Sequence, residues 1–254
     1  MIVNIDIETM PQQGGYDAFL TEAKSNFKAP STLTKTKACE DLGITGNDAK
    51  FTSKDDAIAK WEKAFAEKKA PEVADHEWRK TGLDGAKGEI FSIGIAVADQ
   101  EPRCFSRALM DDGSFSSEAA MLQEFMAAVV ASCNGRPPFF VGQFVAGFDL
   151  KFIFHRCVIN RVRPLFELPF DGRHGQHFYD TQTAWAGFKG RMSQDNLCKA
   201  LGIEGKPHDI DGSKVWDFLK AGKLEAVVEY NIDDVVKNRE IYKRLNFIDS
   251  IETK

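Results

Sequence analysis

Apolar and polar residues alternate over the first nine positions of the chain, which read MIVNIDIET. In a β-strand, successive side chains point to opposite faces of the sheet. The valine and isoleucines then share one face, and Asp6 and Glu8 share the other. The pattern predicts an N-terminal strand that carries two carboxylates side by side.

These two carboxylates allow two interpretations. Like charges two residues apart on one strand repel each other, and burial would require them to be protonated or to find a cation. A divalent cation meets that need, because hard cations take carboxylate oxygens as ligands. An edge strand with a hydrated polar face fits the same pattern, so carboxylates elsewhere in the chain must decide between the two.

The remaining pattern predicts four further strands, and helices around them. The strands are expected at residues 89–98, 103–109, 139–145 and 178–181. Helices are expected at residues 16–27, 53–70, from Pro71 onward, 116–131, from 148, 193–202, 213–221 and 223–247. Residues 29–37 indicate a loop, and Val130 is expected in the buried stripe of the helix over 116–131. The chain is therefore expected to be a single α/β domain over residues 1–254, with a mixed sheet of five strands flanked by helices and a helical insertion at residues 12–77.

Composition limits the possible partners. Apolar residues make up 43% of the chain and charged residues 28%, which is ordinary for a globular protein. The net charge of −5 provides no global basic field, so a polyanion must be held locally. The five cysteines form no CxxC pair, which favours reduced thiols and argues against zinc. With no signal-peptide pattern and no long apolar run, we expect a cytoplasmic protein without a membrane partner.

Two further carboxylates lie where they can meet the first pair. In the helix at 223–247, Asp234 is seven residues from both Val227 and Ile241, so it faces inward, and Tyr230 lies one turn before it. Asp149 begins a helix directly after a strand and a glycine, near the end of the sheet where α/β ligand sites gather. A structural Tyr–Asp hydrogen bond and a simple helix N-cap are the alternatives for these positions.

Together these segments resemble a known nuclease family. The motifs are Asp6-Ile7-Glu8-Thr9, then Phe148-Asp149, then Tyr230-Asn231-Ile232-Asp233-Asp234-Val235. In order and context they resemble the three exonuclease motifs of the DEDD superfamily, in its DEDDy branch. Over residues 1–11 and about 78–247 the chain is similar to stand-alone 3′–5′ exonucleases related to B-family DNA polymerases.

The resemblance implies a ribonuclease H-like fold and a two-metal hydrolase. It implies that Asp6, Glu8, Asp149 and Asp234 bind two Mg²⁺ or Mn²⁺ ions. It further implies that Tyr230 orients the attacking water, and that Thr9, Met10 and Phe148 contact the terminal nucleotide. The expected substrate is the 3′ end of single-stranded DNA, shortened by release of nucleoside monophosphates.

The sequence also allows other interpretations. Relatives often carry Gly-His-Asn where this chain has Gly142-Gln143-Phe144. The resemblance therefore does not define how this segment contacts a substrate. The chain could be a 3′–5′ exoribonuclease, since contacts to a 2′-hydroxyl cannot be located in the sequence. It could instead be a catalytically silent nucleic-acid-binding module, and the first motif faintly resembles that of aspartyl phosphatases. The oligomeric state is not indicated.

Overall fold

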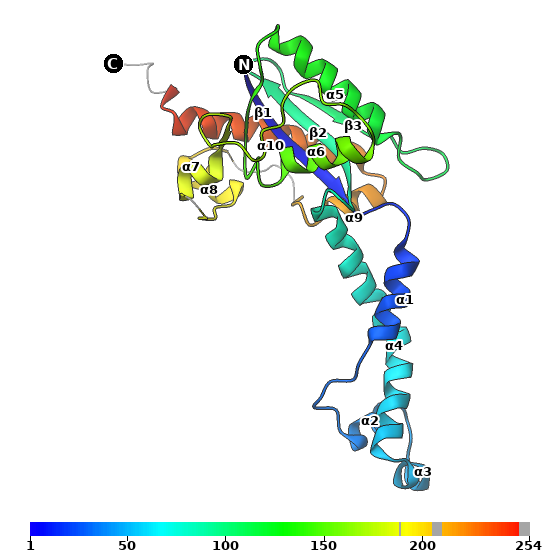
Figure 1. The fold of residues 1–254 in the computed structure, drawn as a ribbon. Coiled ribbons are helices and arrows are strands. Elements are labelled where there is room, and N and C mark those ends of the chain that lie inside the picture. Colours follow the sequence, from blue (N-terminus) through cyan, green and yellow to red (C-terminus); the bar gives the residue numbers. More distant parts are fainter. Residues whose placement is uncertain (188, 205–209, 249–254) are drawn as a thin grey trace. The chain divides into compact units, whose positions relative to one another are not determined.

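The computed structural model describes residues 1–187, 189–204 and 210–248. The chain divides into two compact units, one formed by residues 1–10 and 82–254 and the other by residues 11–81 (Figure 1). A short 3₁₀ helix, Lys80–Leu83, spans the boundary in the sequence.

The first unit is built on a mixed sheet of five strands. They are β1 (Ile2–Met10), β2 (Glu89–Val97), β3 (Arg103–Ser106), β4 (Phe139–Gly142) and β5 (Phe178–Asp180), in the spatial order β3-β2-β1-β4-β5. β2 is antiparallel to both β1 and β3, whereas β4 is parallel to both β1 and β5. The predicted fold class and strand set are confirmed.

β3 and β4 end earlier than the sequence predicts. After β4 the chain turns through Phe144, whose φ of +55° is incompatible with a continued strand. After β3 the chain forms a short loop whose two sides pair through a β-bridge between Leu109 and Phe115, with Gly113 at positive φ. The apolar residues after Ser106 and after Gly142 continue the sequence pattern of a strand, but their backbone is not in a strand.

Helices cover both faces of the sheet (Figure 1). The apolar face of β1 packs in one core cluster with α5 (Glu118–Cys133) and α6 (Asp149–Ile159). The long helix α10 (Leu224–Leu245) lies on the opposite face, against β1 and β2. The prediction that Val130 belongs to the buried stripe of α5 is wrong, because it is 44% exposed while its neighbour Val129 is fully buried. A step of about 100° per residue turns it out of the stripe.

Gly94 permits the close approach of α10. It pairs with Asp6 across the ladder between β1 and β2, on the face that α10 covers. A Cβ atom placed at residue 94 would lie 2.8 Å from Val235 Cγ2 and 3.0 Å from Asn231 Oδ1. The missing side chain therefore lets the helix bring its own polar residues next to Asp6.

Three short helices complete the first unit. They are α7 (Thr181–Ala186), α8 (Gln194–Leu201) and α9 (Val215–Lys220). Helix α8 begins and ends as the sequence predicts, with the Ser193 hydroxyl accepting from the Asn196 N–H and Gly202 in the left-handed conformation. Helix α7 is not predicted by the sequence analysis.

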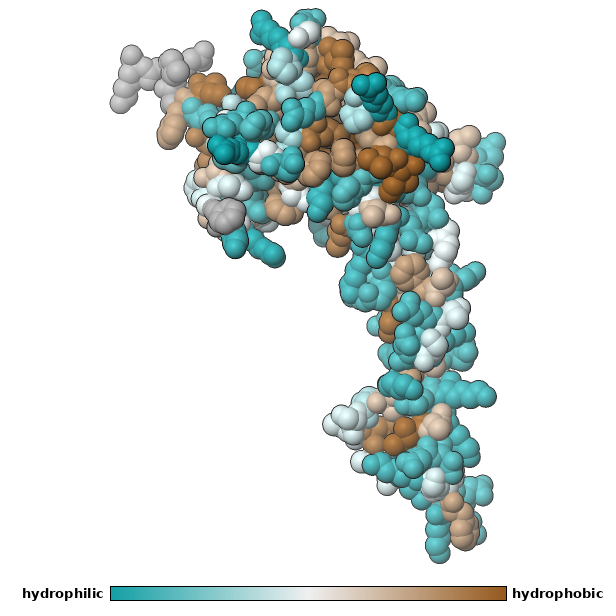
Figure 2. Space-filling model, viewed as in Figure 1, coloured by the Kyte–Doolittle hydropathy of each residue, from teal (hydrophilic) through white to brown (hydrophobic). Residues whose placement is uncertain are grey.

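The second unit is helical, as expected for the insertion. It contains α1 (Tyr16–Asn26), α2 (Lys35–Asp41), α3 (Gly46–Phe51) and α4 (Lys54–Arg79). The Trp61 ring stacks on Phe65 at a centroid distance of 4.3 Å and on Phe27 at 6.0 Å, which gives this unit its own core. Its surface is mainly hydrophilic in the view of Figure 2.

Two expectations for the second unit are wrong. Residues 35–37 are not loop, because Thr34 caps α2 by accepting from the Lys37 N–H. Pro71 does not begin a new helix but lies inside α4. Proline removes one backbone donor, and the buried Ala70, Ala74 and Trp78 on either side continue the apolar face that holds the helix together.

Two further expectations concern the whole chain. All five cysteines lie in the described part of the chain and are free thiols. Within that part, each helix is too short or too polar to cross a lipid bilayer.

A buried ion pair ties α5, α6 and β2 together in the first unit. Glu118 accepts hydrogen bonds from the Arg156 guanidinium at 2.7–3.0 Å, from Asn160 Nδ2 at 2.7 Å and from the Ile90 N–H at 2.7 Å. Both charged side chains are less than 10% exposed. Removing one partner from such a pair leaves an uncompensated buried charge.

We expect Arg156→Met to lower the free energy of unfolding by about 3–5 kcal/mol, measured by urea denaturation. Lys214→Met is the matched control, because Lys214 pairs with Asp211 on the surface at 3.4 Å. That control should change stability by less than about 0.5 kcal/mol. An equally small effect of Arg156→Met would show that the pair does not hold these elements together.

Candidate active site

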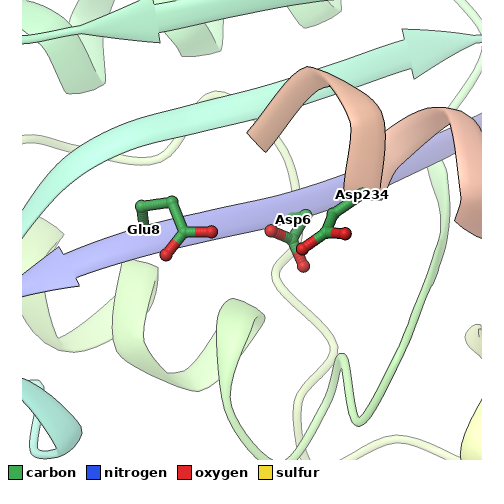
Figure 3. Close-up of side chains that lie close together, drawn as sticks. All are labelled: Asp6, Glu8 and Asp234. Atoms are coloured by element: carbon green, nitrogen blue, oxygen red, sulfur yellow. The ribbon is translucent and has the colours of Figure 1, made fainter. Parts of the chain in front are cut away.

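Three carboxylates from distant parts of the chain meet on the polar face of the sheet. Asp6 and Glu8 come from β1 and Asp234 comes from α10. One ligand oxygen from each lies within 4.8 Å of the others. Figure 3 shows Asp6 and Asp234 pointing toward each other, with the Glu8 carboxylate turned toward them along the strand. The inward orientation predicted for Asp234 is confirmed, since it is 6% exposed.

Asp149 lies beside this cluster but is not among the residues whose ligand oxygens lie within 4.8 Å of one another. It is the first residue of α6, it is 3% exposed, and its Oδ1 accepts from the Ile7 N–H at 3.0 Å. That hydrogen bond fixes the carboxylate to the β1 backbone between Asp6 and Glu8. All four acids that the sequence singles out therefore gather around the same stretch of β1.

Burial and mutual repulsion make Asp6 and Asp149 difficult to ionise. Burial raises the pKa of Asp6 well above its usual value, and the charges of Asp149, Asp234 and Glu8 raise it further. Burial likewise raises the pKa of Asp149 to about 8, although backbone hydrogen bonds, one of them from Ile7, oppose the shift. A positive charge at this place would relieve both effects, because it favours the ionised form of each carboxylate.

Tyr230 lies one turn before Asp234 on α10 and is 5% exposed. Burial raises the pKa of the phenol above its usual value, with smaller contributions from the Glu8 and Asp234 charges and from the side-chain hydrogen bond to Asp234. The phenol therefore remains protonated at neutral pH. It can donate a hydrogen bond but cannot serve as a base.

Asn231 is a site residue that the sequence analysis misses. It is fully buried, and its Nδ2 donates to Asp6 Oδ2 at 2.9 Å. Its Oδ1 accepts from Ser92 Oγ at 3.2 Å and from Cys104 Sγ at 3.4 Å, which sets the orientation of the amide. The available signal is its position three residues before Asp234, on the same side of the helix.

Asp180 is a second missed residue. It ends β5, is 3% exposed, and accepts from the Thr183 N–H at 3.0 Å and the Phe144 N–H at 3.3 Å. Its charge also contributes to the raised pKa of Asp149. The available signal is an aspartate followed by a possible helix start, which is common and weakly specific.

The residues predicted to contact substrate have different surroundings. Thr9 Oγ1 donates to the Gly82 carbonyl at 2.7 Å, and the Met10 side chain is fully buried in a cluster with Phe91 and Tyr230. The Phe148 ring is half-buried and lies 5.5 Å from the Phe152 ring. Their roles toward a substrate stay predictions.

Gln143, which departs from the motif that the sequence resemblance leads us to expect, lies directly after β4. Its Nε2 donates to the Met192 carbonyl and its Oε1 accepts from Thr181 Oγ1. The side chain thus joins the end of β4 to α7 and to the segment before α8. In this structure its role is to connect elements.

We expect Asn231→Ala to weaken the affinity of the acidic cluster for Mn²⁺ about 10–100-fold, because Asp6 loses the amide that orients it. Isothermal titration with Mn²⁺ measures this effect. Asn196→Ala, on the exposed face of α8, is the matched control and should bind as the unmodified chain does. Equal Mn²⁺ affinity in both variants would remove Asn231 from the site.

Comparison with known proteins agrees with this geometry. The structure is similar to that of the family B DNA polymerase from the hyperthermophilic archaeon Pyrobaculum calidifontis, with a TM-score of 0.52 and 12% sequence identity. The match covers 96% of this chain and 24% of the polymerase chain, so the chain spans about a quarter of that protein's length. At this identity the likeness shows the fold, which is the α/β, ribonuclease H-like fold expected from the sequence.

Comparison with curated proteins finds no match. A family model, however, matches residues 86–252, about two thirds of the chain, and is described as a predicted 3′–5′ exonuclease related to the exonuclease domain of PolB. The resemblance noted from the sequence motifs is thereby confirmed. The chain belongs to this family of predicted exonucleases.

Proposed function

We propose that the chain is a metal-dependent 3′–5′ exonuclease that hydrolyses unpaired DNA from its 3′ end and releases nucleoside monophosphates. The observation that carries the proposal is the meeting of Asp6, Glu8 and Asp234 within 4.8 Å on the buried side of α10. A hydrated edge strand does not account for this arrangement, since the polar face of β1 is covered by a helix that adds a third acid.

The site suits two hard divalent cations. Its ligand atoms are all carboxylate oxygens, which Mg²⁺ and Mn²⁺ prefer and which argue against zinc. Asp6, Glu8, Asp149 and Asp234 would hold the ions, and the raised pKa values of Asp6 and Asp149 show how poorly these acids are compensated by protein groups alone. When bound, such ions lower the pKa of a coordinated water and stabilise negative charge on the leaving oxygen.

The chain's own groups then have distinct tasks. Asn231 holds the Asp6 carboxylate in one orientation through its hydrogen bond to Oδ2. Tyr230, whose O–H is hydrogen-bonded to Asp234 here, would donate that O–H to a water or a phosphate oxygen once the Asp234 carboxylate holds a cation. Because the net charge is −5, the protein as a whole does not attract a polyanionic substrate, so local contacts of this kind must bind it.

The proposal is tested with 5′-labelled single-stranded DNA, single-stranded RNA of the same sequence and a blunt DNA duplex. With Mg²⁺ we expect a ladder of products shortened from the 3′ end of the single-stranded DNA, and no ladder with a chelator. Asp234→Asn should reduce the rate on the order of 1,000-fold, because several kcal/mol of charge stabilisation are lost. Glu240→Gln is the control, because Glu240 belongs to the same helix, lies outside the acidic cluster and has a side chain that is 38% exposed.

Each alternative has its own outcome in this assay. Shortening of RNA alone would make the chain an exoribonuclease. Mn²⁺ binding without any product would indicate a silent nucleic-acid-binding module. Equal ladders from the unmodified chain and Asp234→Asn would place the nuclease site elsewhere.

We expect Tyr230→Phe to lower kcat about 10–100-fold and to leave Mn²⁺ affinity within about threefold, because the phenol orients a reactant and is not a ligand. The raised pKa gives a second readout. A group with a raised pKa stays protonated to higher pH, so tyrosinate does not form below about pH 10. The pH–rate profiles of the two proteins should therefore run parallel up to that pH. A pH-dependent rise present only in the unmodified chain would make the tyrosine a base.

A further inference from the structure

A cavity of about 570 Å³ opens near the carboxyl ends of β4 and β5. It is lined by Phe144, Gln182, Lys189, Gly190 and Arg191, and it belongs entirely to the first unit. The proposed active site uses none of these residues. The cavity is polar and aromatic, and its volume lies within the range typical of ligand sites.

Local hydrogen bonds link this cavity to the acidic cluster. Phe144 follows β4, the parallel neighbour of β1, and precedes Asp149 by five residues. Its N–H donates to Asp180, and its carbonyl accepts from the Phe148 N–H at 3.0 Å, at the start of α6. Phe144 therefore stands between the cavity and the turn that presents Asp149.

The conformation of Phe144 is costly for a bulky residue. Its φ is +55°, a region that residues with a Cβ atom rarely adopt, yet the residue is 49% exposed. The ring packs against Gly147, where an added Cβ would lie 2.3 Å from a ring atom. Core packing does not explain an aromatic ring held outward by a strained backbone. Strain of this kind is concentrated at ligand sites.

Two cations complete the lining. Lys189 and Arg191 are exposed and flank Gly190, whose N–H donates to the Gly187 carbonyl at 3.0 Å. A Cβ atom at residue 190 would lie 2.1 Å from the Ala186 carbonyl oxygen, so Gly190 is packed directly on the end of α7. Both cations line the same cavity as Phe144, in a chain whose net charge is negative.

We propose that this cavity holds the unpaired strand upstream of the nucleotide being removed. The Phe144 ring stacks on a base, and Lys189 and Arg191 contact its phosphates. Stacking on an aromatic ring tolerates any base, and cations that follow the backbone add sequence-independent affinity. The inference rests on the proposed function, because it concerns the strand whose 3′ end lies at the acidic cluster.

The first test measures binding of a fluorescent twelve-nucleotide thymidine strand by anisotropy, with a chelator present to prevent hydrolysis. Phe144→Leu should raise Kd about tenfold, and Phe144→Tyr, which keeps an aromatic ring, should restore most of the affinity. The double variant Lys189→Gln with Arg191→Gln should raise Kd and reduce the slope of log Kd against log salt by about 1.4.

Arg136→Gln is the matched control, because this exposed arginine lies just before β4, at the amino end of that strand. It should bind the strand as the unmodified chain does. Thermal denaturation of every variant shows whether it is folded, so that a loss of binding can be distinguished from a loss of folding.

A second measurement separates this inference from the proposed function. Hydrolysis of the p-nitrophenyl ester of thymidine 5′-monophosphate with Mn²⁺ reports on the acidic cluster, and the cavity variants should lose several-fold less activity on it than on the twelve-nucleotide strand. If the ester and the strand are hydrolysed but the cavity variants bind the strand as tightly as the unmodified chain, the inference fails alone. If the unmodified chain hydrolyses neither, the proposed function fails, and with it the role of the cavity beside a nuclease site.

Discussion

Repulsion among carboxylates on the face of the sheet that α10 covers is the constraint on which this structure depends. Asp6, Glu8 and Asp234 lie within 4.8 Å of one another, and burial and repulsion together raise the pKa of Asp6. Folding must bear that cost, because desolvated like charges destabilise the compact state. A divalent cation bound as proposed would convert the same arrangement into a stabilising one. The free energy of folding and the affinity for the cation would then both depend on how these carboxylates are placed.

The surrounding protein groups fix the positions of these carboxylates more than they neutralise their charge. Gly94 allows α10 to reach the sheet, so that Asn231 hydrogen-bonds to Asp6. The amide is itself held by Ser92 and Cys104, and the Asp149 carboxylate is held by a backbone N–H of β1. Each carboxylate oxygen fixed in this way cannot turn away from its neighbours. This fixed arrangement supports the proposal that the site holds divalent cations, because groups that orient ligand carboxylates favour metal binding.

The sequence predicts those parts of the structure that depend on local periodicity. Alternation places the acids of β1 on one face, and seven-residue spacing turns Asp234 inward. It does not predict the role of Asn231, because the partners of that amide come from β2 and β3, whose register against α10 is set by packing. It also places a helix boundary at Pro71, where tertiary contacts along α4 outweigh the one lost backbone donor. Local signals thus locate the acids, whereas the groups that orient them depend on long-range contacts.

The irregular turn after β4 connects substrate handling to the acidic cluster. Asp180 accepts the Phe144 N–H, and the Phe144 carbonyl accepts the Phe148 N–H just before Asp149. A strained residue costs on the order of 1–3 kcal/mol, and it persists only where its surroundings fix it. Here the same hydrogen bonds fix the outward ring and the start of α6. The exposure of the ring and the position of the Asp149 carboxylate are therefore not independent, and a change in this turn acts on both.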